Sequence, residues 1–162
     1  MGKKAINKDG NIEVHNAVPS SFSSTKGTVI GGGQYLTDEQ AKEHGWYDVV
    51  MPSDYDERIH NLSDIFFSED NDYYTYTKTN KTFSDSLSDL KSNKIGELKI
   101  RANSKLQPTD WYVIRKAELG TDIPSDITTA RASIKSTVET KESEINSLTK
   151  KSDVIIYNVN ID

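Results

Sequence analysis

The side chains that could carry catalysis or bind a metal are three histidines, a run of glycines and several neighbouring carboxylates. His15, His44 and His60 stand in separate parts of the sequence and show no His-Glu-x-x-His spacing. That spacing is what places two ligands on one face of a helix around zinc. None of the three adjoins a Gly-x-Ser-x-Gly segment, which would expose a nucleophilic serine. We interpret all three as surface or loop histidines.

The glycine run 31–33 and the acidic stretches 54–57 and 70–72 are the remaining candidates. The glycine run lacks the Lys-Ser/Thr ending of a phosphate-binding loop, so we predict a turn. Carboxylate oxygens suit calcium, but neither acidic stretch has a twelve-residue loop with a central glycine and a final glutamate. The absence of cysteine excludes disulfides, thiolate-bound zinc and thiol nucleophiles. We therefore predict no catalytic residue, no cofactor and no metal, and a protein that is not an enzyme.

The chain has 162 residues and a low content of apolar side chains with which to build a core. The apolar set makes up 34% and, with the nine glycines, roughly 40%, against about 45–50% in ordinary globular proteins. Fourteen aromatic residues argue against a wholly disordered chain. We expect a lean protein that finishes burying its apolar stripes against partners. No apolar run exceeds four residues, so no membrane span is predicted, and the first eight residues contain no apolar signal segment.

Charge is distributed unevenly along the chain. Residues 38–72 carry eleven Asp or Glu against two basic residues, a sum of −9, whereas residues 85–116 sum to +3. The aromatic-rich part is thus largely the acidic part, which disfavours nucleic-acid binding. The acidic stretch is interpreted as a solvated surface, with a docking site for a basic host or regulatory partner as the alternative.

The pattern of residues predicts an α+β fold with a β-rich part at 1–83 and a helical part at 84–162. Asp9-Gly10 is a hairpin signal between two short apolar runs. The stretch 59–83 predicts an aromatic hairpin with its turn at 69–72, because aromatic residues alternate with polar ones after that turn. Thr37 and Gln40 have the spacing of a helix capping box.

In the helical part, apolar residues recur at helical spacing over 85–106, and a long helix is predicted from Pro124 to about Lys151. The long helix has a 4-3 apolar seam in which Arg131 and Lys141 are the charged positions. A helical hairpin within the chain and self-association through the same stripe both fit this seam. The tail 154–161 is predicted to pair as a strand with this chain or a neighbour. The predicted partner or oligomer interface consists of Ile127, Ile134, Val138, Ile145, Leu148, Val154 and Ile156.

A short helix between these two carries Trp111 and Ile114, spaced to face the same way. We predict that both are buried against the long helix, so that Trp111→Ala would cost on the order of 3–5 kcal/mol. The predicted core residues are Trp46, Tyr74, Tyr76, Leu98, Trp111 and Ile114.

Three stretches together resemble a known group of proteins. They are Asn16-Ala-Val-Pro-Ser-Ser-Phe22, Gly45-Trp-Tyr-Asp-Val-Val50, and Leu106-Gln-Pro-Thr-Asp-Trp-Tyr-Val-Ile-Arg-Lys-Ala-Glu-Leu-Gly120 before a helix that starts at a proline. This combination is similar to small proteins encoded among the tail and tail-fibre genes of tailed bacteriophages. The resemblance covers about residues 16–150, and the lysine-, asparagine- and serine-rich helices and the apolar tail depart from it.

The resemblance implies a virion structural or adaptor protein associated with tail or fibres, made in the host cytoplasm and assembled as a homo-oligomer with other phage structural proteins. It implies no catalytic residues. The charge pattern and the short apolar runs independently predict no nucleic-acid and no membrane partner. The alternative within the same group is a tail-fibre assembly chaperone that leaves before the particle is finished.

Overall fold

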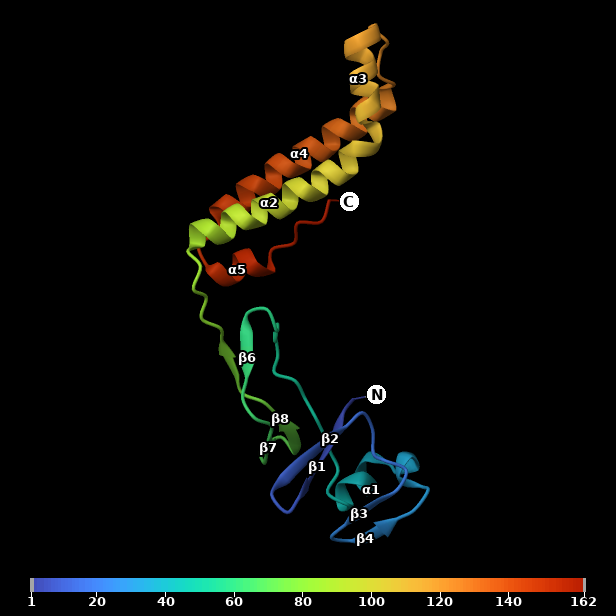
Figure 1. Cartoon of the computed structure of the whole chain (residues 1–162). Coiled ribbons are helices and arrows are strands. Elements are labelled where there is room, and N and C mark those ends of the chain that lie inside the picture. Colours follow the sequence, from blue (N-terminus) through green and yellow to red (C-terminus); the bar gives the residue numbers. More distant parts are fainter. Residues whose placement is uncertain (1, 162) are drawn as a thin grey trace. The chain divides into compact units, whose positions relative to one another are not determined.

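A computed structural model describes residues 2–161 of the chain. Strands and hairpins occupy the N-terminal half and long helices the C-terminal half, so the predicted α+β class is confirmed (Figure 1). The chain divides into two compact units, residues 1–81 and 82–162, which we call the β unit and the helical unit. The predicted division was at 83/84.

In the described part of the β unit, nine short strands form small antiparallel pairings. β1 pairs with both β2 and β5, β3 with β4, β6 with β9, and β7 with β8. The strands are β1 (Lys4–Lys8), β2 (Asn11–His15), β3 (Phe22–Ser24), β4 (Gly27–Val29), β5 (Tyr47–Asp48), β6 (His60–Leu62), β7 (Phe66–Ser68), β8 (Tyr73–Thr75) and β9 (Lys78–Asn80). A 3₁₀ turn, η1 (Gly33–Tyr35), and helix α1 (Asp38–Glu43) lie between β4 and β5.

Local turn chemistry explains these elements. Asp9 and Gly10 both have positive φ, 53° and 88°, as a tight hairpin turn between β1 and β2 requires. Asp72, φ 58°, ends the turn of the aromatic hairpin β7–β8. The predicted capping box is confirmed at α1, where Thr37 accepts from the N–H of Gln40 and the Gln40 side chain accepts from the N–H of Thr37.

The β unit closes around Trp46, whose side chain is fully buried. Tyr74, also a predicted core residue, is buried, and Tyr76 is half-buried. Gly33 is needed at the edge of this core, because a Cβ there would lie 1.9 Å from the carbonyl oxygen of Pro19. The core cluster consists of Ile6, Val18, Phe22, Ala41 and Trp46.

The helical unit is a helical hairpin with two additions. Helix α2 (Leu87–Leu106) lies beside α4 (Ser125–Ser147), and α5 (Lys151–Ile156) packs on α2 (Figure 1). A 3₁₀ turn, η2 (Gln107–Thr109), connects α2 to α3 (Asp110–Leu119). The core cluster consists of Leu98, Ala102, Ile145, Val159 and Ile161.

The 4-3 seam of α4 is used inside the chain. Ile134 and Val138 pack against the cluster around Leu98, and Ile145 belongs to it and is fully buried. The antiparallel register is marked by the ion pair between Lys99 and Glu142, 3.1 Å. The structure therefore contains the helical hairpin. The prediction that Ile145 lies in an oligomer interface is wrong, because its side chain is fully buried within the chain.

The predicted terminal strand is wrong. Val154 and Ile156 lie in helix α5, and the residues that follow, to Ile161, belong to no strand in the described part of the helical unit. The helix satisfies its backbone hydrogen bonds locally while it buries Val154 completely. After it, Val159 and Ile161 are each 5% exposed and enter the core.

The prediction that Trp111 and Ile114 lie in a core is also wrong. Trp111 is 49% exposed and Ile114 is 56% exposed. Pro108 lies in the 3₁₀ turn between α2 and α3 and has no N–H to continue the helical ladder. As a result α3 turns off the line of α2 and leaves the face of α4 (Figure 1).

Candidate functional site: the exposed helix α3

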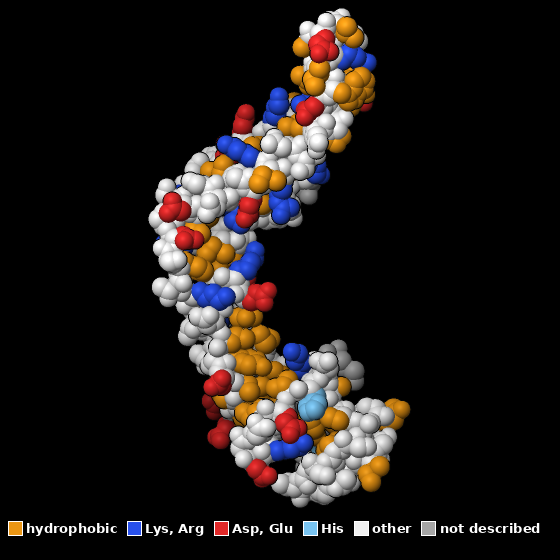
Figure 2. Space-filling model, viewed as in Figure 1, with side chains coloured by type: hydrophobic (Ala, Val, Ile, Leu, Met, Phe, Trp, Pro, Cys, Tyr) orange, Lys and Arg blue, Asp and Glu red, His pale blue; other side chains and the backbone are white. Residues whose placement is uncertain are grey.

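Helix α3 is the most exposed apolar element of the helical unit. It has ten residues and none of them is buried. Figure 2 shows hydrophobic side chains gathered over this end of the helical unit. Exposed apolar side chains that gather at one place on a soluble protein often mark an interaction site. The large exposed apolar residues of α3 are Trp111, Val113, Ile114 and Leu119.

Local signals define the two ends of α3. Asp110 places a negative charge in the first turn and Lys116 a positive charge in the last, both favourable to the helix dipole. Gly120 takes the left-handed conformation, φ 70°, and donates its N–H to the carbonyl of Lys116 at 3.0 Å. A helix of this length is marginal on its own in water, because most helical stability comes from packing an apolar face. Packing against a partner would therefore stabilise α3.

Arg131 of α4 fixes the start of α3. Its guanidinium donates to the Leu106 carbonyl at 2.9 Å and to Thr109 Oγ1 at 2.6 Å, and pairs with Asp110 Oδ1 at 2.9 Å. The Arg131 side chain is only 13% exposed. One cation thus ties the end of α2, the 3₁₀ turn and the first residue of α3 to α4.

One side of α3 carries an aromatic and cationic group. The rings of Trp111 and Tyr112 lie 3.9 Å apart, and the Arg115 guanidinium stands 4.7 Å and 5.3 Å from their centroids. Cation–π contacts of this kind hold a long side chain in place. The group spans roughly 100° of the helix circumference, because successive residues are about 100° apart and Arg115 lies between Trp111 and Tyr112 in this projection.

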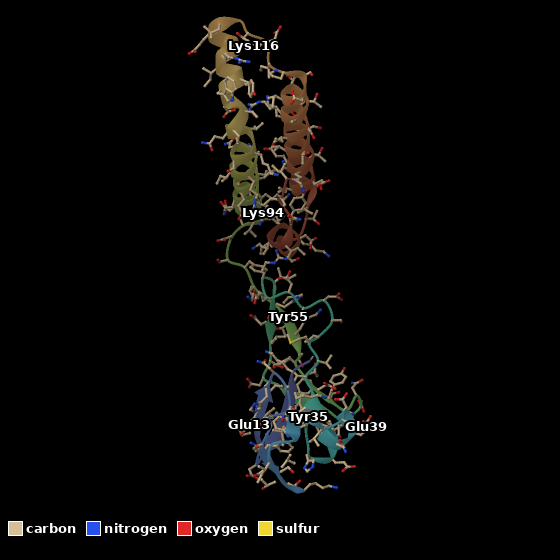
Figure 3. All side chains as sticks on the ribbon, turned by 90° about the vertical axis from the view of Figure 1, so that its right-hand side faces the viewer. Glu13, Tyr35, Glu39, Tyr55, Lys94 and Lys116 are labelled. Atoms are coloured by element: carbon tan, nitrogen blue, oxygen red, sulfur yellow. The ribbon has the colours of Figure 1, made fainter. Side chains whose placement is uncertain are left out.

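The opposite side of α3 is a stripe of Asp110, Val113, Ile114 and Ala117, spaced i, i+3, i+4 and i+7. We call it the α3 stripe. All four of its residues are exposed. Lys116 and Glu118 flank it on either side at about 100° per residue. Figure 3 shows Lys116 near the far end of the helical unit, well away from Lys94 in the first half of α2. The Lys116 ammonium pairs with Asp122 at 3.1 Å.

The residues predicted as an interface do not gather on one free surface. Ile145 and Val154 are fully buried, at different places in the helical unit. The others are half-buried, and two of them pack directly on the core of α2 and α4. These half-buried residues are Ile127, Ile134, Val138, Leu148 and Ile156.

The histidines lie apart from one another, and one of them has a serine beside it. Ser24 Oγ is 2.9 Å from His44 Nδ1, a contact between strand β3 and the C-cap of α1 that sequence spacing did not reveal. A hydrolase triad requires a carboxylate on the other histidine nitrogen, and among the described residues none is hydrogen-bonded to His44. The Ser24 hydroxyl is also within 3.2 Å of the Gly27 carbonyl, so it braces the β3–β4 turn. His60 Nδ1 accepts the N–H of Asp56 at 3.0 Å.

Within residues 2–161 no group of three His, Asp or Glu side chains is placed to hold a metal ion. No helix in that range is long and apolar enough to span a bilayer. An open groove of about 580 Å³ lies between α2 and the C-terminal segment, lined by Ile100, Arg101, Ser104, Lys105, Asn160 and Ile161.

The acidic stretch 38–72 is partly neutralised by the β unit itself. Lys4 Nζ lies 2.7 Å from Asp38 and 3.0 Å from Asp48. A side-chain hydrogen bond from Arg58 lowers the pKa of Asp56 to about 2.

Searches of protein-family models, of curated proteins and of solved structures found no match to this chain.

The spacing of Trp111 and Ile114, three residues apart, predicts one buried stripe and does not predict the exposed face of α3. A signal was present, since Trp111 to Ile114 are four successive apolar residues. Four successive positions point around most of a helix, so one neighbouring helix cannot cover all of them.

Proposed function

We propose that this chain is a non-enzymatic structural or adaptor protein of a tailed-bacteriophage particle, associated with the tail or fibres. It is made in the host cytoplasm, assembles as a homo-oligomer and remains in the virion with other phage structural proteins. The resemblance of residues 16–150 supports the setting.

The observation that carries the proposal is the exposed apolar helix α3. Its ten residues include four large apolar side chains between 42% and 74% exposed. Burying them removes apolar area from water, at about 25 cal/mol per Å², the main favourable term in most protein–protein association. An assembly protein works through such a surface and needs no reacting group.

The test is mass spectrometry of gradient-purified phage particles, with peptides of this chain quantified against the major capsid protein. A stoichiometric amount in intact particles is expected. Absence from particles together with abundance in the infected-cell lysate would overturn retention in the virion and favour the assembly chaperone.

A pair of phage variants sharpens this test. Ile114→Glu places a charge on α3, and Ile100→Glu places the same charge on another exposed isoleucine, on α2. We expect the first to reduce incorporation into particles and the second to leave it unchanged. Equal incorporation of both variants would contradict a role for α3 in assembly.

A further inference from the structure

We propose that His60 and Asp56 form a pH-sensitive switch, which holds the loop 53–59 closed while the His60 imidazole is neutral and opens it when the ring is protonated. We call this loop, which lies between Pro52 and strand β6, the acidic loop. The switch goes beyond the virion role proposed above, because it lies in the β unit and uses no residue of α3.

His60 is a buried titratable residue with one defined hydrogen-bond partner. It is 9% exposed, although the sequence predicts a surface or loop histidine. Its Nδ1 accepts the backbone N–H of Asp56 at 3.0 Å, and the Tyr55 ring lies beside the imidazole with the two centroids 6.2 Å apart. A ring nitrogen accepts a hydrogen bond only while its lone pair is free. This contact therefore requires the neutral ring, with its proton on Nε2.

Asp56 is the residue around which the acidic loop folds. Its carbonyl accepts the N–H groups of Ile59 at 3.1 Å and His60 at 2.9 Å. Its carboxylate accepts the backbone N–H of Arg58 at 2.9 Å and the Arg58 guanidinium at 2.6 Å. The N–H, the carbonyl and the carboxylate of Asp56 are thus all bonded within the loop or to the residue that follows it. Loss of the bond to His60 loosens the point where the loop closes.

Protonation of His60 turns its acceptor nitrogen into a donor. The N–H of Asp56 then faces an N–H of the ring in a buried place, and an unsatisfied buried donor is costly. A side-chain hydrogen bond from Arg58 lowers the pKa of Asp56 to about 2, so this carboxylate stays charged in weak acid. It attracts the imidazolium, and an N–H of the ring that turns to it competes with Arg58. Acid therefore replaces a main-chain contact by a side-chain contact.

The other charged groups around His60 hold the ends of the acidic loop. Lys78 of β9 donates to the Ser53 carbonyl at 2.5 Å, and Lys81 donates to the Glu57 carbonyl at 2.6 Å. Both lysines stay charged at neutral and weakly acidic pH, so these contacts do not change, and they disfavour a further positive charge nearby. The titratable and charged groups that surround the ring are Tyr55, Asp56, Glu57 and Arg58 of the loop, and Lys78 and Lys81 from the neighbouring strand.

The first experiment follows the imidazole nitrogens and the backbone amides of the full-length chain by NMR between about pH 7.5 and about pH 5, where histidine changes charge. We expect the His60 proton on Nε2 at the higher pH. On acidification the protection of the Asp56 amide against hydrogen exchange should fall by about tenfold or more. Protection factors are compared, because the intrinsic exchange rate also depends on pH. The amides of α4, which contains no histidine, should keep their protection.

A pair of variants assigns the effect to His60. His60→Asn places an amide oxygen close to the position of Nδ1, where it accepts the same N–H but does not titrate. We expect its Asp56 amide to be equally protected at both pH values. His44→Asn is the matched control, because His44 contacts Ser24 and not the acidic loop. It should keep the pH dependence at Asp56. Circular dichroism verifies that both variants are folded.

Three results would overturn the switch. The first is a proton on Nδ1 of His60 at the higher pH, and the second is an Asp56 amide whose protection is the same at both pH values in the unmodified chain. Both are measured without any substitution, so they do not depend on the folding of a variant. The third is an equal loss of protection in His60→Asn, which would assign the opening to another group. None of these results changes the amount of the chain in phage particles, so the two proposals fail separately.

Discussion

Arg131 and Asp110 face each other across the bend between α2 and α3, 2.9 Å apart. In the sequence, Arg131 occupies one of the seam positions of the long helix, which are otherwise mostly apolar. It fills a position that a hydrophobic residue could not, because three acceptors converge there from the end of α2, the 3₁₀ turn and α3. This contact holds the start of α3 to α4 at the bend that Pro108 introduces.

Replacing Arg131 by leucine should therefore destabilise the helical unit. The Leu106 carbonyl and Thr109 hydroxyl would lose a donor in a partly buried place, at a cost of about 1–3 kcal/mol. Chemical denaturation followed by circular dichroism measures the change. Lys135→Leu, on the exposed side of α4, is the control and should change stability by less than about 0.5 kcal/mol. Equal effects would show that the bend does not depend on this cation.

The two tryptophans should respond very differently to truncation. Trp46 is fully buried, so Trp46→Ala should cost about 3–5 kcal/mol. Trp111 is half-exposed, so Trp111→Ala should cost only about 1 kcal/mol, well below the expectation for a core position. Urea midpoints of the two variants give the comparison. A larger loss at Trp111 than at Trp46 would contradict the exposure of α3.

The C-terminal segment should show alternating sensitivity. Ile161 is 5% exposed within the core, so Ile161→Ala should cost about 2–5 kcal/mol. Asn160 is exposed, and Asn160→Ala should change stability by less than about 0.5 kcal/mol. The measurement is again a denaturation midpoint. Two neutral substitutions would mean that the segment does not dock on α2.

Tyr157 should make the helical unit sensitive to alkali. Burial, and then the hydrogen bond that its hydroxyl donates to Glu144, raise the pKa of Tyr157 to about 12. The unfolded value is 10.0, so the folded state holds its proton longer. Stability from this group is complete below pH 10 and is lost as the pH rises towards 12.

Ultraviolet titration of the phenolate, compared with that of Tyr157→Phe, isolates this proton. Glu144→Gln should lower the pKa of Tyr157 from about 12, since it replaces a charged acceptor by a neutral one. An unchanged titration in that variant would remove Glu144 as a cause and leave burial alone.

Features governed by local chemistry were predictable from the sequence. Asp9-Gly10 favours a tight hairpin turn, because both residues accept a positive φ. Thr37 and Gln40 bond the free backbone N–H groups at the start of α1, and this does not depend on what packs against the helix. The 4-3 seam of α4 predicted that Ile134 and Val138 pack together, but it could not distinguish another part of the chain from another copy. The partner was α2.

Features set by the direction of an element could not be predicted in the same way. Pro108 predicts the end of a helix. The angle between α2 and α3 also depends on the 3₁₀ turn that joins them and on the contacts of Arg131, which the sequence pattern does not show. The tail looked like a strand because Val154 to Tyr157 are apolar and mostly β-branched. Docking against α2 outweighed that propensity, as packing commonly does.

The placement of the tryptophans has a consequence for spectroscopy. Trp46 lies in the β unit and Trp111 in the helical unit, one sealed from water and one beside it. Each unit therefore contains a single indole fluorophore, and their emission maxima should differ. Replacing either by phenylalanine leaves a chain whose fluorescence reports on one unit alone. A pair of such variants can tell whether the two units unfold in one transition or in two.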